Sequence, residues 1–263
     1  MATQQKTASP KKKGFQGVKA AIWIIVACFI LAVLIFTQVL AKAAPGSVLA
    51  LIHAGGIVVP VIHTLLLTVI AMSVERWLAL RTAFGKQNLA KFTANIKEAI
   101  KAKDFGKAQN LCDKMEGSVA NVVSASLNAY KEMKETEGVE KSLKIAKIQQ
   151  AHEEATQLEM PTLQMNLPII ATIVTLGTLT GLLGTVIGMI RSFAALAAGG
   201  GGDSMKLSEG ISEALINTAF GIGTSWLAVT SYNYFTNKID KLTYALDEVG
   251  YTIAQTYEAT EEA

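Results

Sequence analysis

The sequence is poor in the residue types that build catalytic and metal sites. It has only three histidines and two cysteines among 263 residues. His152 is followed by two glutamates, but Thr156 stands where a metalloprotease helix needs its second histidine. Gly199–Gly202 is not followed by Lys and Ser or Thr, as a phosphate-binding loop would be. We therefore expect no enzymatic activity, no cofactor and no metal ion.

Charged residues are scarce as well. They make up 17% of the chain against 51% hydrophobic residues, and this balance excludes an ordinary soluble domain. Cys28 lies in an apolar run and Cys112 in a charged block, so no disulfide framework is expected. The net charge of +3 gives no sign of a nucleic-acid partner.

Four long uncharged or nearly uncharged runs are each able to cross a bilayer, which takes about 20 apolar residues. The sequence thus predicts an all-α fold: a polytopic helical membrane protein whose long transmembrane helices extend into a cytoplasmic helical domain. The predicted segments are a disordered basic tail (1–17), an extra N-terminal transmembrane helix (18–41), a transmembrane helix (52–80), the cytoplasmic helical domain (81–159), a long transmembrane helix (160–198), a periplasmic loop (199–209), a transmembrane helix (210–237) and a cytoplasmic C-terminal helix (238–263).

Whether residues 1–41 are retained or cleaved stays open at this point. Ala41-Lys42-Ala43 has the small-residue form of a signal-peptidase site. The apolar run before it, Ala20 to Ala41, exceeds the roughly 7–15 residues of a signal core, which favours a retained anchor.

The basic residues are distributed unevenly along the chain. Five precede Ala20, fourteen lie between Arg76 and Lys147, and two follow Tyr232. Because cytoplasmic loops carry the excess of Lys and Arg, this pattern places the N-terminus, the charged block and the C-terminus in the cytoplasm. The connections after the first and third spans then lie on the opposite side of the membrane.

The third run carries two adjacent stripes of small and hydroxyl residues. At about 100° per residue, one helix face collects the glycines and the next collects mainly threonines. Small residues let membrane helices approach closely, and hydroxyls require polar partners away from lipid. The glycine stripe, a predicted packing face, is Gly177, Gly181, Gly184 and Gly188; the second stripe includes Thr175, Thr178 and Thr185. In the fourth run, Thr218 and Ser225 share one face, while Glu213 lies about 140° away from Thr218.

The segments LLGTVIGMIRSF (182–193), GISEALINTAFGIG (210–223) and SYNYF (231–235) resemble the signature region of the ExbB/TolQ/MotA proton-channel family, nearest to ExbB. The resemblance extends from about Leu167 to Lys241. It implies a homopentamer that encloses a single-span ExbD- or TolR-like partner carrying an essential aspartate, and a TonB-like protein that transmits the motion. It also implies that Thr185 and Thr218 line the pore and that Glu213 belongs to the proton pathway.

The residues themselves point to half of a proton pathway. The four runs offer Glu213, two histidines and hydroxyls, and hydroxyls do not titrate near neutrality. We expect Thr185, Thr218, Glu213, Thr178, Thr175 and Ser225 to form the pathway, with the missing acid supplied by a partner. The alternative is that the threonines only bond backbone carbonyls. His63 is either a proton relay or a histidine hydrogen-bonded within the helix bundle.

These observations predict a proton-channel subunit of a bacterial inner membrane, in contact with lipid, that energises TonB-dependent outer-membrane transport. A TolQ-like role, a gliding or flagellar stator, and a non-conducting membrane scaffold are the alternatives.

Overall fold

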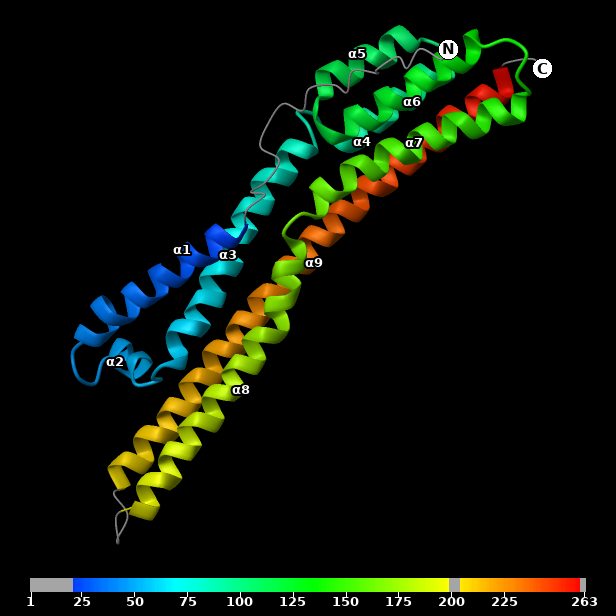
Figure 1. Cartoon of the computed structure of the whole chain (residues 1–263). Helices are drawn as coiled ribbons and strands as arrows, with labels where there is room; N and C mark the ends of the chain where they lie inside the picture. The colour runs from blue at the N-terminus through cyan, green and yellow to red at the C-terminus, as the bar shows by residue number, and fades with distance from the viewer. Residues whose placement is uncertain (1–20, 199–203, 261–263) are drawn as a thin grey trace. The chain divides into compact units, whose positions relative to one another are not determined.

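The structure is a computed structural model that describes residues 21–198 and 204–260. Every regular element in these two ranges is helical, which confirms the predicted all-α class (Figure 1). Three helical stretches are long and apolar enough to cross a membrane: Ala21–Lys42, Val58–Ala83 and Leu167–Ala197. The chain is therefore a polytopic helical membrane protein. The predicted basic tail and the Gly199–Gly202 connector lie outside the described residues.

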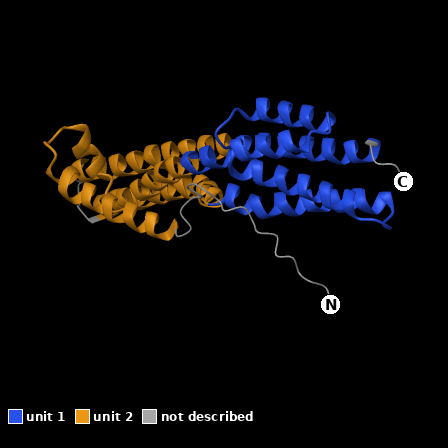
Figure 2. Ribbon diagram, turned by 90° about the horizontal axis from the view of Figure 1, so that it is seen from above, with its two compact units in different colours: residues 1–17, 77–165, 236–263 blue, residues 18–76, 166–235 orange. Residues whose placement is uncertain are grey.

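The helices are arranged in two compact units (Figure 2). Unit 1 contains the described residues 77–165 and 236–260, and unit 2 contains 21–76, 166–198 and 204–235. In chain order the elements are α1 (Ala21–Leu34), a π-helical turn (Ile35–Val39), a 3-10 turn (Leu40–Lys42), α2 (Val48–His53), α3 (Val58–Ala83), α4 (Leu89–Lys101), α5 (Phe105–Met115), α6 (Gly117–Glu135), α7 (Lys141–Gln164), α8 (Leu167–Ala198) and α9 (Ser204–Thr260).

Several helix ends differ from the predicted segment boundaries. The predicted helix 160–198 is interrupted, because α7 ends at Gln164 and Asn166 adopts a φ of 65° before α8 begins. Asparagine tolerates this left-handed conformation better than most residues, and Pro168 suits the first turn of α8. At residue 237 the predicted boundary is absent, since α9 is one helix of 57 residues that continues to Thr260. Its 210–237 part is not among the three apolar stretches.

In unit 2, α8 and α9 pack with their backbones in contact at glycines. A Cβ on Gly181 would lie 3.1 Å from the Cα of Gly221, and one on Gly188 would lie 2.6 Å from the carbonyl oxygen of Gly210. Later residues of α8 therefore contact earlier residues of α9, so the two helices are antiparallel, as the short connection between them predicts. Gly177, Gly181, Gly184 and Gly188 are all buried on this face. Close approach of this kind gains dispersion energy where lipid offers no hydrophobic drive.

The segment between α2 and α3 makes a tight turn at two glycines. Ser47 caps α2 by accepting a hydrogen bond from the amide of Ala50 at 3.2 Å. Gly56 then has a φ of +73°, which only glycine adopts without strain. The predicted span 52–80 accordingly begins at Val58, after this turn.

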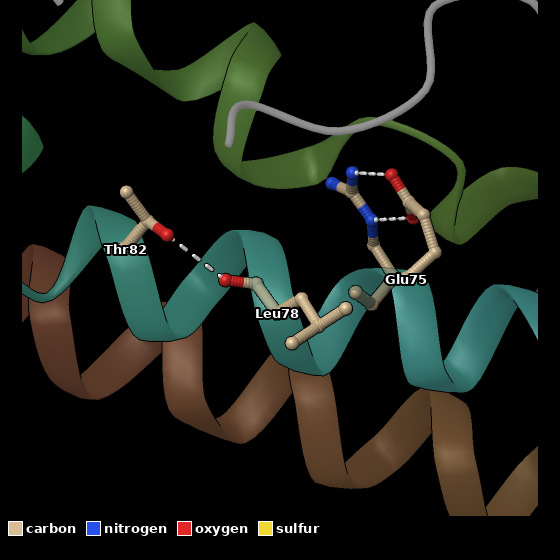
Figure 3. A network of polar contacts seen from close by, with 4 residues as sticks. Glu75, Leu78 and Thr82 are labelled. Atoms are coloured by element: carbon tan, nitrogen blue, oxygen red, sulfur yellow. Dashed lines mark hydrogen bonds and ion pairs between the residues drawn. The ribbon is translucent and has the colours of Figure 1, made fainter. Parts of the chain in front are cut away.

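Near the end of α3, two neighbouring charged residues are buried together. Arg76 is fully buried, and its Nε and Nη2 donate to the two carboxylate oxygens of Glu75 at 2.6 and 2.5 Å. Figure 3 shows this pair beside the hydrogen bond from Thr82 to the carbonyl of Leu78. A bidentate guanidinium contact offsets part of the cost of removing both charges from water.

An aromatic cluster joins α5, α6 and α9 in unit 1. Tyr130 on α6 is fully buried between Phe105 and Tyr257, with ring centroids at 4.4 and 4.8 Å. The hydroxyl of Tyr257 donates to the carbonyl of Met133 at 3.0 Å. These contacts attach the last turns of α9 to α6.

His152 of α7 is buried between α6 and α9. Its Nδ1 lies 2.9 Å from the hydroxyl of Ser126, while its Nε2 is buried without a hydrogen-bond partner. The ring rests on Gly250, where an added Cβ would lie 2.6 Å from Nε2. Burial lowers the pKa of His152, and Asp247 and Glu153 oppose this shift only in part. The neutral ring therefore fits this position, and the charged ring does not.

We predict that the stability of unit 1 falls as the pH falls below about 6.5. The unfolded chain takes up a proton on His152 near its ordinary pKa of 6.5, whereas the folded chain resists it, so acid favours unfolding. Thermal unfolding of the full chain in detergent between pH 7.5 and 5.5 measures this effect. His152→Leu should reduce the dependence on pH, and His53→Leu should retain it. An unchanged pH dependence in His152→Leu contradicts the prediction.

We predict that Gly221→Ala weakens the α8–α9 pair, whereas Gly223→Ala does not. The new Cβ at Gly221 would lie 2.6 Å from the carbonyl oxygen of Gly177, and Gly223 has no neighbour within 4 Å of that position. Overpacking costs about 1–3 kcal/mol, while alanine favours helix over glycine by about 1 kcal/mol. The midpoint of thermal unfolding should therefore drop in the first variant only. Equal midpoints would show that the backbone contact is unimportant.

Candidate functional site

Two threonine hydroxyls meet where α8 and α9 pack. The side-chain oxygens of Thr185 and Thr218 are in direct contact, and either one is able to donate the hydrogen. Each also lies near a carbonyl oxygen of its own helix, Thr185 at 3.2 Å from Gly181 and Thr218 at 3.1 Å from Ala214. Both side chains are half-buried. The glycine contacts described above are what bring these two short side chains within reach.

A second hydroxyl pair repeats the arrangement two turns away. Thr178 of α8 donates to the hydroxyl of Ser225 at 2.8 Å. Ser225 is buried, while Thr178 remains largely exposed on the same face as Thr175. We call Thr178, Thr185, Thr218 and Ser225 the hydroxyl seam. Thr175 lies beside it and is exposed.

The hydroxyl seam has the chemistry of a relay without an acid. A hydroxyl donates one hydrogen and accepts others, so it orients water or a neighbouring group, but it does not release a proton near neutrality. Its four side chains join α8 to α9 in pairs without any carboxylate or imidazole among them. Proton transfer along the seam therefore requires a titratable group from elsewhere.

Glu213 does not join the hydroxyl seam. It lies five positions before Thr218, which puts the two side chains about 140° apart on α9. Its side chain is 7% exposed and accepts two hydrogen bonds from the Nη1 of Arg191, at 2.7 and 2.9 Å. It also lies against Gly56 of the α2–α3 turn. The structure thus gives Glu213 partners within its own chain, on the side of α9 away from the threonines.

Two residues near this carboxylate were not singled out from the sequence. Asn217 is fully buried, and its Nδ2 donates to the carbonyl of Gly55 at 2.8 Å. Arg191 comes from the last turns of α8 and leaves half of its side chain exposed. The sequence contained a signal for both, since Asn217 is an amide inside a mainly apolar run and Arg191 is the single charge near the end of another.

His63 lies on α3 and faces α9. Its Nδ1 is 2.9 Å from the carbonyl oxygen of Val59, and its ring lies 5.1 Å from that of Phe220. The hydrogen-bond distance to Val59 lies within α3, and neither of the two contacts involves the hydroxyl seam. The described residues contain no group of three or more His, Cys, Asp or Glu side chains able to hold one metal ion.

The outer faces of α8 and α9 are apolar, and none of the other described residues covers them. They require lipid or protein, since exposed apolar surface of this extent is not found on water-soluble monomers. The large side chains concerned are Leu176, Leu179, Leu182, Leu183, Val186, Ile190 and Phe193 on α8, and Ile211, Leu215, Ile222 and Trp226 on α9.

Comparison with known proteins indicates the family of this sequence. Residues 118–248 match the sequence model of the MotA/TolQ/ExbB proton channel family. The chain is 27% identical to the Tol-Pal system protein TolQ of Pseudomonas aeruginosa over 189 residues, 69% of this chain and 81% of that protein. It is 27% identical to the biopolymer transport protein ExbB of Xanthomonas campestris over 182 residues, 65% of this chain and 71% of that protein.

A shorter and more similar match is to the putative biopolymer transport protein ExbB-like 1 of Synechocystis, 51% identical over 57 residues, 20% of this chain and 22% of that protein. The family is one of proton channels and not of enzymes. The glycines and threonines at the contact of α8 and α9 lie within the matched residues, and the chain belongs to the MotA/TolQ/ExbB proton channel family.

Proposed function

We propose that the chain is the proton-conducting stator subunit of an inner-membrane motor of the ExbB–ExbD kind, which uses the proton motive force to energise TonB-dependent outer-membrane transport. The observation that carries the proposal is the contact of Thr185 with Thr218. It aligns two hydroxyls in the half-buried seam of two glycine-packed helices. Together with the family membership, a hydroxyl pair of this kind supports proton transfer more directly than a purely structural role.

The missing acid comes, in this proposal, from a partner subunit. A single-span ExbD- or TolR-like protein with an aspartate in its helix fits, because its carboxylate would lie against the hydroxyl seam. A homopentamer of this chain would surround such a helix and cover the apolar faces of α8 and α9. A TonB-like protein would then receive the motion.

The proposed orientation follows from the basic residues. The positive-inside rule puts the N-terminus and the charged block of residues 81–159 in the cytoplasm. The 210–237 part of α9 then serves as the fourth span. Four of its polar residues are buried within unit 2 and so are shielded from lipid: Glu213, Asn217, Thr224 and Ser225.

A TolQ-like role in the cell envelope is the second candidate. It is favoured by the alignment with TolQ of Pseudomonas aeruginosa, which covers 81% of that protein. Mass measurement of the intact complex purified from its native membrane would give the subunit number and the co-purifying partner. An ExbD-like partner supports the first role, and a TolR-like partner supports the second. A partner with a peptidoglycan-binding domain would instead indicate a MotA-like stator.

We predict that Thr185→Val and Thr218→Val each reduce proton flux roughly tenfold. Valine keeps the shape but removes the hydroxyl, and an interhelical hydrogen bond in a membrane is worth about 1–2 kcal/mol. The measurement is proton uptake into liposomes that contain the chain and its single-span partner.

Thr180→Val and Thr230→Val are the matched controls. Each of these hydroxyls donates only to its own helix, to Leu176 at 2.6 Å and to Trp226 at 2.8 Å. Both controls should conduct like the wild type. If flux is unchanged in the Thr185 and Thr218 variants as well, the chain is a scaffold rather than part of the proton path.

A further inference from the structure

The turn between α2 and α3 lies directly on the polar face of α9. The carbonyl of Gly55 accepts the hydrogen bond from Asn217, and Gly56 lies against the carboxylate of Glu213. A Cβ on Gly55 would lie 3.1 Å from the Cγ2 of Ile216. Three residues within about one turn of α9, Glu213, Ile216 and Asn217, therefore lie against two successive glycines. We call Gly55, Gly56, Arg191, Glu213 and Asn217 the turn dock.

The turn dock depends on the absence of side chains at its two glycines. A Cβ on Gly56 would lie 3.0 Å from the Cδ of Glu213 and 3.2 Å from the Nη1 of Arg191. The positive φ of Gly56 adds a second requirement for glycine. Gly46 has the same kind of backbone, with a φ of +80°, but nothing lies within 4 Å of its Cβ position. The chain thus contains a matched pair of glycines, one in the dock and one outside it.

Arg191 compensates the charge of Glu213. The carboxylate is almost completely buried, and a buried charge without a partner is strongly unfavourable. The guanidinium supplies two charge-assisted hydrogen bonds from α8, while half of it stays in contact with the surroundings. The pair therefore connects α8 to α9 at the same level as the α2–α3 turn.

The turn dock and the hydroxyl seam are adjacent on α9, because Asn217 of the dock directly precedes Thr218 of the seam. The side chain of Asn217 lies over Gly184, where an added Cβ would be 2.8 Å from its Nδ2. Thr218 follows Asn217 on α9, and Thr185 follows Gly184 on α8. A rotation of α9 that releases Asn217 from Gly55 would also separate the two hydroxyls.

We propose that Arg191 and Asn217 are positioning residues, which with Glu213 hold α9 on the Gly55–Gly56 turn in the rotation that brings Thr218 against Thr185. Glu213 acts here as the fixed charged partner of Arg191 and does not carry protons. The inference rests on the proposed function only in the experiment that measures proton flux, and not in the one that measures cross-linking.

The flux experiment separates a positioning carboxylate from a proton carrier. Arg191→Met strands the buried carboxylate and should reduce flux at least about tenfold, whereas Glu213→Gln keeps an acceptor for Arg191 and should lose less than about threefold. The double variant Arg191→Met/Glu213→Gln removes both charges and should recover most of the flux lost in Arg191→Met. A double variant as inactive as Arg191→Met, or an inactive Glu213→Gln, would overturn the inference.

A cross-linking experiment tests the position without any flux. Thr185→Cys with Thr218→Cys places two thiols where the hydroxyls now touch, within the reach of a disulfide. In the full chain in membranes, adding Gly56→Ala should slow oxidation of this pair severalfold, and adding Gly46→Ala should leave it unchanged. Equal rates in the two variants would overturn the inference. If Gly56→Ala slows the oxidation and Gly46→Ala does not, but the wild-type chain conducts no protons, only the proposed function is rejected.

Discussion

The direct contact of two helix backbones at Gly181 and Gly221 is the constraint on which the rest of unit 2 depends. A threonine side chain is short, so Thr185 reaches Thr218 only when the helix axes are close. Larger residues at the glycines would push the axes apart and put apolar atoms between the hydroxyls. The distance between the axes of α8 and α9 therefore determines both the helix packing and the hydroxyl contact, and a change in one changes the other.

The two sides of α9 perform different tasks within one apolar unit. Toward α8 it presents Thr218 and Ser225, which form hydrogen bonds between uncharged hydroxyls. Toward the α2–α3 turn it presents Glu213 and Asn217, whose bonds involve a guanidinium and a backbone carbonyl and are harder to break. In the proposed function, the charged and amide contacts hold the helix in place while the hydroxyl side takes part in proton transfer.

Periodicity along the chain was sufficient to predict the helical class, and it was the basis for grouping the glycines and the threonines by helix face. These properties depend on which residues share a helix face, and a repeat of 3.6 residues determines that. The partner of Glu213 was not predictable in this way, because Arg191 lies 22 residues away and periodicity says nothing of which faces meet. The break at Asn166 was missed because an uncharged run reads as continuous, although one residue with positive φ interrupts it. The unbroken α9 was missed for the opposite reason: the change from apolar to charged sequence at residue 238 alters the surroundings of a helix without ending it.

The hydroxyl contact between Thr185 and Thr218 has no built-in polarity, since either oxygen is able to be the donor. A chain of such contacts passes a hydrogen equally well both ways. In the proposed function this contact sets no direction for proton transfer, so the direction would have to come from the partner's acid and from the voltage across the bilayer. Reversing that voltage would reverse the current through the same residues.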